Sequence, residues 1–412
     1  MQILILLTFF FAIWSFKIER TIVGLGTIFF GSWFFSALLY SLDIFQFHPE
    51  EEKLIILLGS SFCFFFVGFL FSDMFFKENV KRIPSNSYRQ TIHEKKTIDL
   101  FFYIFVFLLA LRFSSTFIEL LLRYGSVSEI FSQGDATYYS SRHEGRGAGI
   151  PVLIPVEALV TFFGMLRFAR MGFFDRITKI SVLMVLGLII LNQSRSTLLA
   201  CFLTSLAPLA MYSGNLKIFT LKRLVVLLSI IMTITLSRNL EIKGSQDSAL
   251  SGFEYIGQLG SLVFYLGGGL AGLNEYLRLG VDEYSGLYSL NGLVLIFETL
   301  SLQSGLAFRY DPVTYYTPYP TIMATAFRYL FDDFGWATPV IMLFLGFFTR
   351  YTSITAKRSA FSVLFLSYLY FFLGLSFFGY APFLMSFWLF LIVSGFVVFL
   401  SKSNFLRVFY DK

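Results

Sequence analysis

The chain has 412 residues, of which 56% are hydrophobic and only 14% are charged, and its net charge is +6. A soluble fold would leave much of that apolar surface in water, so the composition predicts an integral membrane protein built from bilayer-spanning helices. The basic residues do not form a patch with interleaved aromatic residues, which argues against a nucleic-acid partner.

About 11 apolar runs are long enough to be transmembrane helices, which predicts an all-α, polytopic membrane protein with a single integral domain over residues 1–412. The first run lacks a basic leading segment and a small-residue cleavage site, so we interpret it as a spanning helix and not a secretory signal. The predicted spans are residues 2–16, 21–40, 53–72, 98–122, 150–169, 177–193, 195–213, 221–237, 336–350, 360–376 and 382–400.

The charged residues between these runs predict the topology. Basic clusters follow every odd-numbered span, and the largest lies in the predicted loop 73–97. Because loops rich in lysine and arginine stay in the cytoplasm, this side is predicted to be cytoplasmic. The segments 123–149 and 237–335 then form outer, periplasmic loops. The loop 73–97 has no nucleotide-binding glycine pattern, so nucleotide-driven activity is not expected.

The loop 237–335 contains two stretches that resemble spans, Gly257–Leu273 and Gly286–Phe308. The connector between them carries Arg278, Asp282 and Glu283 and is not a basic cytoplasmic loop. We therefore predict re-entrant or interfacial helices that line a cavity.

Arginines on the outer side are the main candidates for ligand binding, because a permanently charged planar guanidinium suits phosphate oxygens. Arg195 lies in a tight turn between two apolar helices and has no acidic residue near it in sequence, so it needs an anion from elsewhere. Several of the others have an acidic neighbour and could instead form ion pairs, as Arg328 could with Asp332. The other candidates are Arg142, Arg146, Arg238, Arg309 and Arg328.

Polar and aromatic residues in the same loops add further candidates. Tyr139 lies in a glycine-rich loop dense in hydrogen-bonding groups, and Tyr315 belongs to a tyrosine-rich run that suits sugar rings or, alternatively, an interfacial aromatic belt. Four residues could serve as a general base, and the sequence does not choose among them: His143, Glu144, Glu241 and Asp311. Two cysteines and three scattered histidines predict neither a disulfide framework nor a zinc site.

Three patches resemble the O-antigen polymerase family, the oligosaccharide repeat-unit polymerases of bacterial surface polysaccharides. They are the small-residue Ser-Arg and Leu-Leu turn of Leu191–Leu199, the glycine-rich patch Tyr265–Gly269, and the Pro-Thr, Tyr, Asp-Phe-Gly progression from Pro320 to Gly335. The sequence departs from the pattern at Trp336-Ala337, where a second small residue is common.

The resemblance implies a glycosyltransferase of the membrane-embedded C superclass in the bacterial inner membrane, with its active site facing the periplasm. Such an enzyme transfers a growing glycan from its undecaprenyl pyrophosphate carrier to a new lipid-linked repeat unit, and a chain-length regulator protein is a further partner to expect. Neither a cofactor nor a metal is expected, because arginines can neutralise the diphosphate leaving group. Two alternatives stay open: an O-antigen ligase that transfers glycan to lipid A core, and a lipid-linked glycan flippase or secondary transporter.

Overall fold

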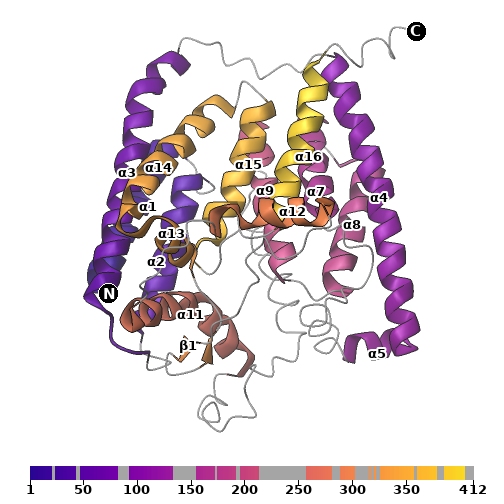
Figure 1. Ribbon diagram of the computed structural model, residues 1–412. Helices are drawn as coiled ribbons and strands as arrows, with labels where there is room; N and C mark the ends of the chain where they lie inside the picture. Colours follow the sequence, from indigo (N-terminus) through magenta and orange to yellow (C-terminus); the bar gives the residue numbers. More distant parts are fainter. Residues whose placement is uncertain are drawn as a thin grey trace. The chain divides into compact units, whose positions relative to one another are not determined.

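The computed structural model describes residues 1–20, 24–42, 47–81, 92–132, 155–171, 174–191, 195–212, 257–280, 288–301, 315–316, 320–321, 325–356, 360–377 and 385–403. Within these ranges the fold is all-α (Figure 1). The strands among the described residues, β1 (Tyr315–Tyr316) and β2 (Pro320–Thr321), form a short antiparallel pair in which Tyr315 lies opposite Thr321.

Helices occupy the predicted spans, except for 221–237, which lies outside the described residues. A long apolar helix satisfies its backbone groups internally, which is what a chain in a bilayer requires. The helices are α1 (Gln2–Glu19), α2 (Leu25–Ser41), α3 (Glu52–Lys81), α4 (Ile92–Tyr124), α7 (Val156–Met171), α8 (Arg176–Leu191), α9 (Arg195–Tyr212), α14 (Thr338–Thr355), α15 (Ala360–Leu375) and α16 (Met385–Lys402).

Two of these helices extend beyond their predicted ends. The predicted cytoplasmic loop 73–97 is partly helical, because α3 continues to Lys81 and α4 already begins at Ile92. An apolar run predicts the part of a helix that lies in a bilayer, whereas glutamate and lysine favour helix as well and continue it into water. The prediction therefore located both helices correctly, but it ended α3 too early and began α4 too late.

Helical elements also fill the described part of the predicted outer loop 237–335. They are α11 (Gly257–Leu279), the 3₁₀ turn η4 (Tyr288–Leu290), α12 (Asn291–Ser301), and α13 (Ala326–Phe334), which is followed by a second 3₁₀ turn, η5 (Gly335–Ala337). Gly335 ends α13 with φ 54° and ψ −137°, a backbone conformation that essentially only glycine adopts. This turn connects α13 to α14.

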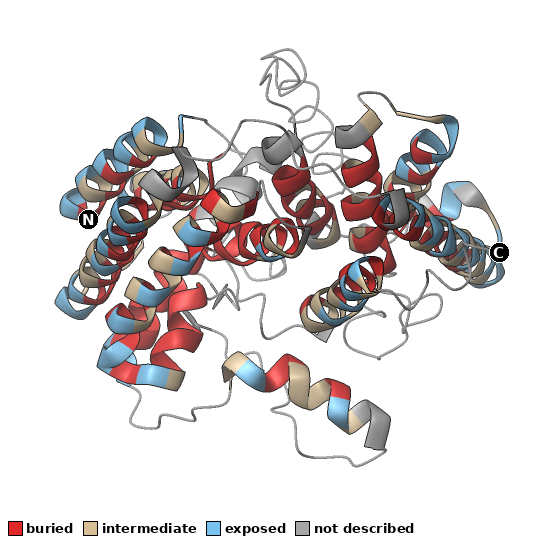
Figure 2. Ribbon diagram, turned by 90° about the horizontal axis from the view of Figure 1, so that it is seen from above, coloured by how far each residue is buried: buried red, intermediate tan, exposed pale blue. Residues whose placement is uncertain are grey.

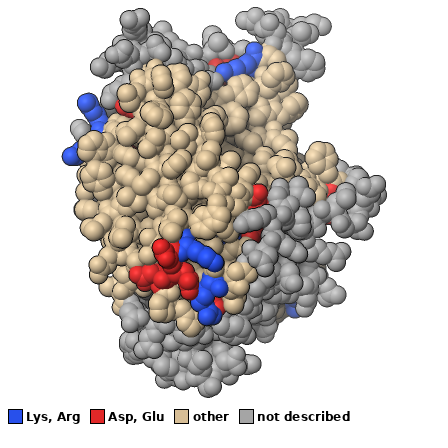
Figure 3. All heavy atoms as spheres, turned by 60° about the vertical axis from the view of Figure 1, so that its left-hand side comes forward, with Lys and Arg blue, Asp and Glu red and all other residues tan. Residues whose placement is uncertain are grey.

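Among the residues that the structure describes, four segments are long and apolar enough to cross a membrane: Gln2–Glu19, Glu52–Phe76, Glu94–Tyr124 and Ala326–Thr355. Buried and exposed residues lie on opposite faces of the helices (Figure 2), and exposed side chains such as Leu6 and Phe10 on α1 are apolar. On the face shown in Figure 3, charged side chains lie toward two ends with an uncharged band between them. These features are those of a multi-pass membrane protein.

The chain forms two compact units. The first comprises Met1–Ser85, Leu240–Ala356 and Tyr368–Trp388, and the second comprises Asn86–Asn239, Lys357–Ser367 and Leu389–Lys412. The short helix α5 (Val127–Ser132) belongs to the second unit, where Ile130 packs in a small core with Leu120 and Leu191. The prediction of one integral domain over the whole chain stays a prediction.

Close helix packing organises the first unit, in which α3 and α14 lie side by side. A Cβ atom on Gly68 would overlap the carbonyl oxygen of Leu343, and one on Gly346 would overlap that of Phe65. Glycine on both helices therefore lets the two backbones touch, as small residues do in membrane helix pairs. The Arg350 Nε atom on α14 also donates to Asp73 Oδ1 on α3 at 2.9 Å.

Candidate functional site

Most of the predicted site residues lie outside the described part of the chain. Of Arg195 and Tyr315 the structure describes the backbone alone: Arg195 is the first residue of α9 and Tyr315 the first of β1. Arg328 is the predicted site residue whose side chain is described. The residues outside the described ranges are Tyr139, Arg142, His143, Glu144, Arg146, Arg238, Glu241, Arg309 and Asp311.

Arg328 is buried in the first turn of α13, and the start of this helix is held by the helices around it. The Ala326 N–H donates to the carbonyl oxygen of Ser376 at 2.8 Å, while the Ser376 hydroxyl accepts from the Trp33 indole at 2.9 Å. The Phe327 ring packs edge-on against Trp33 with centroids 5.2 Å apart. This apolar packing on one side of α13 positions Arg328 within the protein.

Two tyrosine rings lie next to the Arg328 guanidinium. Its central carbon is 5.2 Å from the ring centre of Tyr276 on α11 and 5.4 Å from that of Tyr329. A guanidinium attracts the electron-rich faces of aromatic rings, and this attraction strengthens where water is excluded. Arg328 thus keeps its charge in a buried position with part of its stabilisation coming from aromatic rings.

Asp332 connects Arg328 to α11. Its Oδ2 atom is 3.8 Å from Arg328 Nε, one helical turn away, and its Oδ1 atom accepts a hydrogen bond from the Tyr276 hydroxyl. The ion pair that the spacing of Arg328 and Asp332 allowed is therefore present. It does not exclude a ligand, because a guanidinium carries five N–H donors.

Asp333 has a different partner. Its carboxylate accepts the backbone N–H groups of Tyr288 at 2.8 Å and Ser289 at 2.6 Å, and the Ser289 hydroxyl as well. It thereby caps the turn η4 and brings the Tyr288 ring to 5.6 Å from the ring of Tyr329. The neighbouring aspartates Asp332 and Asp333 thus hold α11 and η4, respectively, against α13.

The C-terminal half of α11 is anchored to the segment before α3. Asn274 accepts the Glu51 N–H at 2.8 Å and donates to the carbonyl oxygen of Pro49 at 2.9 Å. The next residue, Glu275, accepts two hydrogen bonds from Arg278, at 2.8 and 2.5 Å, and these bonds lower its pKa although burial opposes the change. α11 therefore has fixed contacts next to Tyr276.

We call Tyr276, Tyr288, Arg328, Tyr329 and Asp332 the arginine–tyrosine site. Chemically it offers one permanent positive charge, one carboxylate and three aromatic rings. A guanidinium binds phosphate oxygens, aromatic faces stack on the C–H faces of sugars, and carboxylates accept sugar hydroxyls. The sequence predicted Arg328, but it did not single out Tyr276 or Tyr288, because nothing local shows that α11 and η4 pack against α13.

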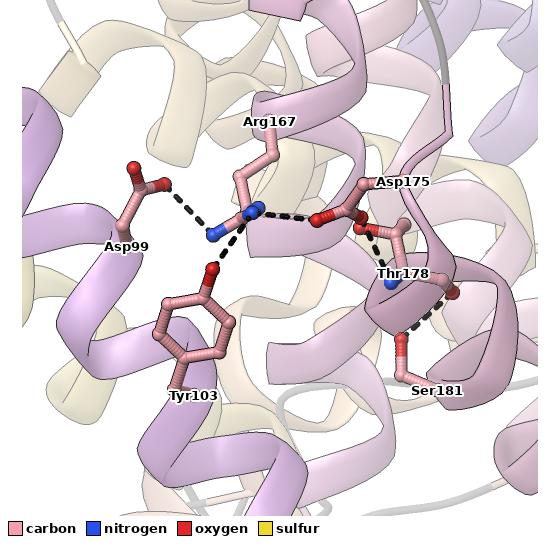
Figure 4. A network of polar contacts seen from close by, with 6 residues as sticks. All are labelled: Asp99, Tyr103, Arg167, Asp175, Thr178 and Ser181. Carbon is pink, nitrogen blue, oxygen red and sulfur yellow. Dashed lines mark hydrogen bonds and ion pairs between the residues drawn. The ribbon is translucent and has the colours of Figure 1, made fainter.

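Among its described side chains, the second unit contains two buried arginines within predicted spans. Arg167 on α7 donates to Asp99 on α4 at 2.9 Å and to Asp175 at 2.8 Å, and its Nη2 atom also reaches the Tyr103 hydroxyl at 3.3 Å (Figure 4). Arg112 on α4 pairs with Glu157 on α7. Sequence reasoning missed this second pair, although single charged residues inside apolar runs are a usable signal.

The fold and the site define a class of protein: a multi-pass helical membrane protein with an arginine–tyrosine site beside one of its candidate membrane spans. Comparison with known proteins adds no family to this class, since no family model, curated protein or solved structure matches the chain.

Proposed function

We propose that this protein is a membrane glycosyltransferase that polymerises undecaprenyl-pyrophosphate-linked oligosaccharide repeat units into O-antigen or a related surface polysaccharide. The observation that carries the proposal is the arginine–tyrosine site, in which a buried guanidinium meets aromatic rings and a carboxylate. Three residues of the site, Arg328, Tyr329 and Asp332, lie in the segment from Pro320 to Gly335 that resembles the polymerase family. The protein would act in the bacterial inner membrane with this site facing the periplasm.

The proposed reaction requires positive charge at the leaving group. The acceptor hydroxyl oxygen attacks the anomeric carbon of the growing glycan, and the bond from that carbon to the diphosphate oxygen breaks. The departing diphosphate gains negative charge, which Arg328 would stabilise; Arg195 is the arginine that the sequence alone predicts for this role. The hydroxyl proton passes to a base, for which Glu144, Glu241, Asp311 and His143 are the residues predicted from the sequence.

The aromatic rings give the same site a means of holding the sugars. The rings of Tyr276, Tyr288 and Tyr329 come from α11, η4 and α13. Asp332 and Asp333 hold Tyr276 and Tyr288 by hydrogen bonds, and the Tyr329 ring packs against that of Tyr288. Rings that are fixed before a ligand arrives lose little conformational freedom on binding. We infer that they stack on the sugar next to the diphosphate.

The proposal is tested with purified protein in liposomes supplied with lipid-linked repeat units and without lipid A core. A polymerase gives a ladder of glycan lengths, a ligase gives no product without the core, and a transporter moves the lipid unchanged. We expect a ladder from the wild type and its loss in Arg328→Ala and Arg195→Ala.

The matched control is Arg123→Ala, which removes an exposed arginine paired with Glu119 one turn away on α4. Such surface pairs contribute about 0–1 kcal/mol, so insertion and activity should persist. Each variant is first checked for normal membrane insertion and a single peak in gel filtration. An undiminished ladder from well-folded Arg328→Ala would refute the role given to the arginine–tyrosine site.

A further inference from the structure

The pair of Arg112 and Glu157 in the second unit has hydrogen-bonding capacity that the described residues do not use. Arg112 Nη2 on α4 is 3.0 Å from Glu157 Oε1 on α7, and the two side chains are only 11% and 2% exposed. Both residues lie within predicted membrane spans, where charged side chains are costly and mark functional positions. The two charged groups therefore need hydrogen-bond partners inside the protein.

Several polar atoms of this cluster are buried and lack a hydrogen-bond partner among the residues that the structure describes. They are Arg112 Nε and Nη1 and Glu157 Oε2, together with the hydroxyl of Thr116, one helical turn after Arg112 on the same face of α4. Leaving a buried donor or acceptor without a partner is costly, and more so for a charged group. A small polar molecule at this position would remove that cost.

Net charge and hydrogen-bonding capacity determine which kind of molecule fits between these groups. Arg112 and Glu157 already neutralise each other, so an added anion or cation would introduce a net charge into an apolar surrounding. The unused atoms are guanidinium donors and a carboxylate acceptor, so a molecule that both donates and accepts fits them. A buried water typically makes about three hydrogen bonds to polar groups of this kind.

Cys201 on α9 provides a reporter at the same place. It is buried, forms a hydrogen bond with the Thr161 side chain, and lies within electrostatic range of both Glu157 and Arg112. Thr161 in turn donates to the Glu157 carbonyl oxygen at 2.6 Å. Cys63, the other cysteine of the chain, is half-buried on α3 in the first unit and is the natural comparison.

We propose that Arg112, Glu157 and Thr116 form an internal water-binding site among α4, α7 and α9, which hydrates this ion pair within the apolar part of the second unit. This inference is independent of the proposed transferase activity. It gives the protein a second polar site, one that takes neutral hydroxyl groups and excludes phosphate, in contrast to the arginine–tyrosine site.

X-ray radiolysis with mass spectrometry tests this proposal on the intact protein in detergent. Radiolysis converts bound water to hydroxyl radicals, which oxidise the side chains next to it, and cysteine reacts readily. We expect Cys201 to be oxidised faster than Cys63 although Cys201 is the more deeply buried. An oxidation rate of Cys201 equal to or below that of Cys63 in the wild-type protein would overturn the proposal.

Variants identify the residues that hold the water. The double variant Arg112→Met/Glu157→Met replaces the pair by apolar side chains, a change that buried ion pairs often tolerate, and should lower the Cys201 rate to that of Cys63. Thr116→Val should lower it in part. The control Thr97→Val removes another buried hydroxyl of α4 that lacks a partner among the described residues, about five turns before Thr116, and should change nothing.

Two results from the variants would also count against the site. An unchanged Cys201 rate in the double variant would place the water elsewhere, and an equal loss in Thr97→Val would point to a general effect of altering α4. If the double variant does not fold, the wild-type comparison and Thr116→Val decide the question.

Discussion

Asp175 shows at the scale of one residue how a loop carboxylate holds two helices. It lies just before α8, where its Oδ1 atom accepts the Thr178 N–H at 2.9 Å and caps the helix, while its Oδ2 atom accepts from Arg167 on α7 at 2.8 Å (Figure 4). Burial alone would raise its pKa, but these bonds from Thr178 and Arg167 outweigh burial, and the pKa of Asp175 is lowered.

The lowered pKa predicts a dependence of stability on pH. A carboxylate whose pKa is lower in the folded than in the unfolded state stabilises the fold above its unfolded pKa, about 3.9, and loses that contribution as the pH falls through the folded value. Asp175→Asn keeps the capping acceptor but removes the charge, so we expect a loss of about 1–2 kcal/mol at pH 7.

The measurement is the unfolding temperature of wild type and Asp175→Asn in detergent from pH 7 to pH 3. The difference between them should be full at neutral pH and shrink below about pH 4. Glu119→Gln, which alters an exposed ion pair on α4, serves as control and should differ little from wild type at any pH. A constant difference between wild type and Asp175→Asn across this range would contradict the assigned ion pair.

At the scale of elements, the contact between α3 and α14 depends on two glycines. An added methyl group at Gly68 or Gly346 would meet the backbone of the facing helix, which cannot turn aside as a side chain can. We therefore expect Gly68→Ala and Gly346→Ala each to destabilise the protein by about 1–3 kcal/mol.

Gly59 is the matched control because it lies on α3 as well, where a Cβ atom would meet only Leu4 at an ordinary 3.9 Å. Since alanine favours helix more than glycine does, Gly59→Ala should be neutral or stabilising by up to about 1 kcal/mol. Thermal unfolding followed by circular dichroism compares the three variants. Equal stability of all three would show that the helices are not in backbone contact.

The sequence predicted the helices well wherever a long apolar run marks their bounds. α1, α2 and α8 begin and end within a few residues of their predicted bounds, because Leu, Ile and Phe in long runs leave a bilayer helix as the one satisfactory arrangement. The end of α3 and the start of α4 were wrong, since the polar turns there carry no signal of that kind. The prediction that the two stretches Gly257–Leu273 and Gly286–Phe308 of the outer loop contain helices was confirmed by α11 and α12.

At the scale of the whole molecule, the site was less predictable than the helices. Arg328 could be singled out as an arginine of the predicted outer loop, and its spacing from Asp332 left an ion pair open as an alternative, which the structure shows. Tyr276 and Tyr288 could not be assigned in this way. Tyr276 contacts Arg328 and Asp332, while Tyr288 contacts Tyr329 and Asp333. These contacts join residues about 40 to 60 positions apart, which no local pattern records.

The proposed transferase function requires the arginine–tyrosine site to face away from the cytoplasm, so the membrane topology of the whole chain tests it. Leu290 in η4 is 46% exposed and follows Ser289, which Asp333 binds, so a cysteine there reports on the side of the site. Lys402 at the end of α16 is also exposed and belongs to the last predicted cytoplasmic cluster. A cysteine at Lys402 should report the opposite side.

The most direct test of the account is labelling of Leu290→Cys and Lys402→Cys with a membrane-impermeant maleimide, in intact spheroplasts and in inverted vesicles, with the wild-type chain as the blank. We predict that Leu290→Cys is labelled in spheroplasts and Lys402→Cys only in inverted vesicles. Labelling of Leu290→Cys only in inverted vesicles would place the arginine–tyrosine site in the cytoplasm and contradict the proposed function.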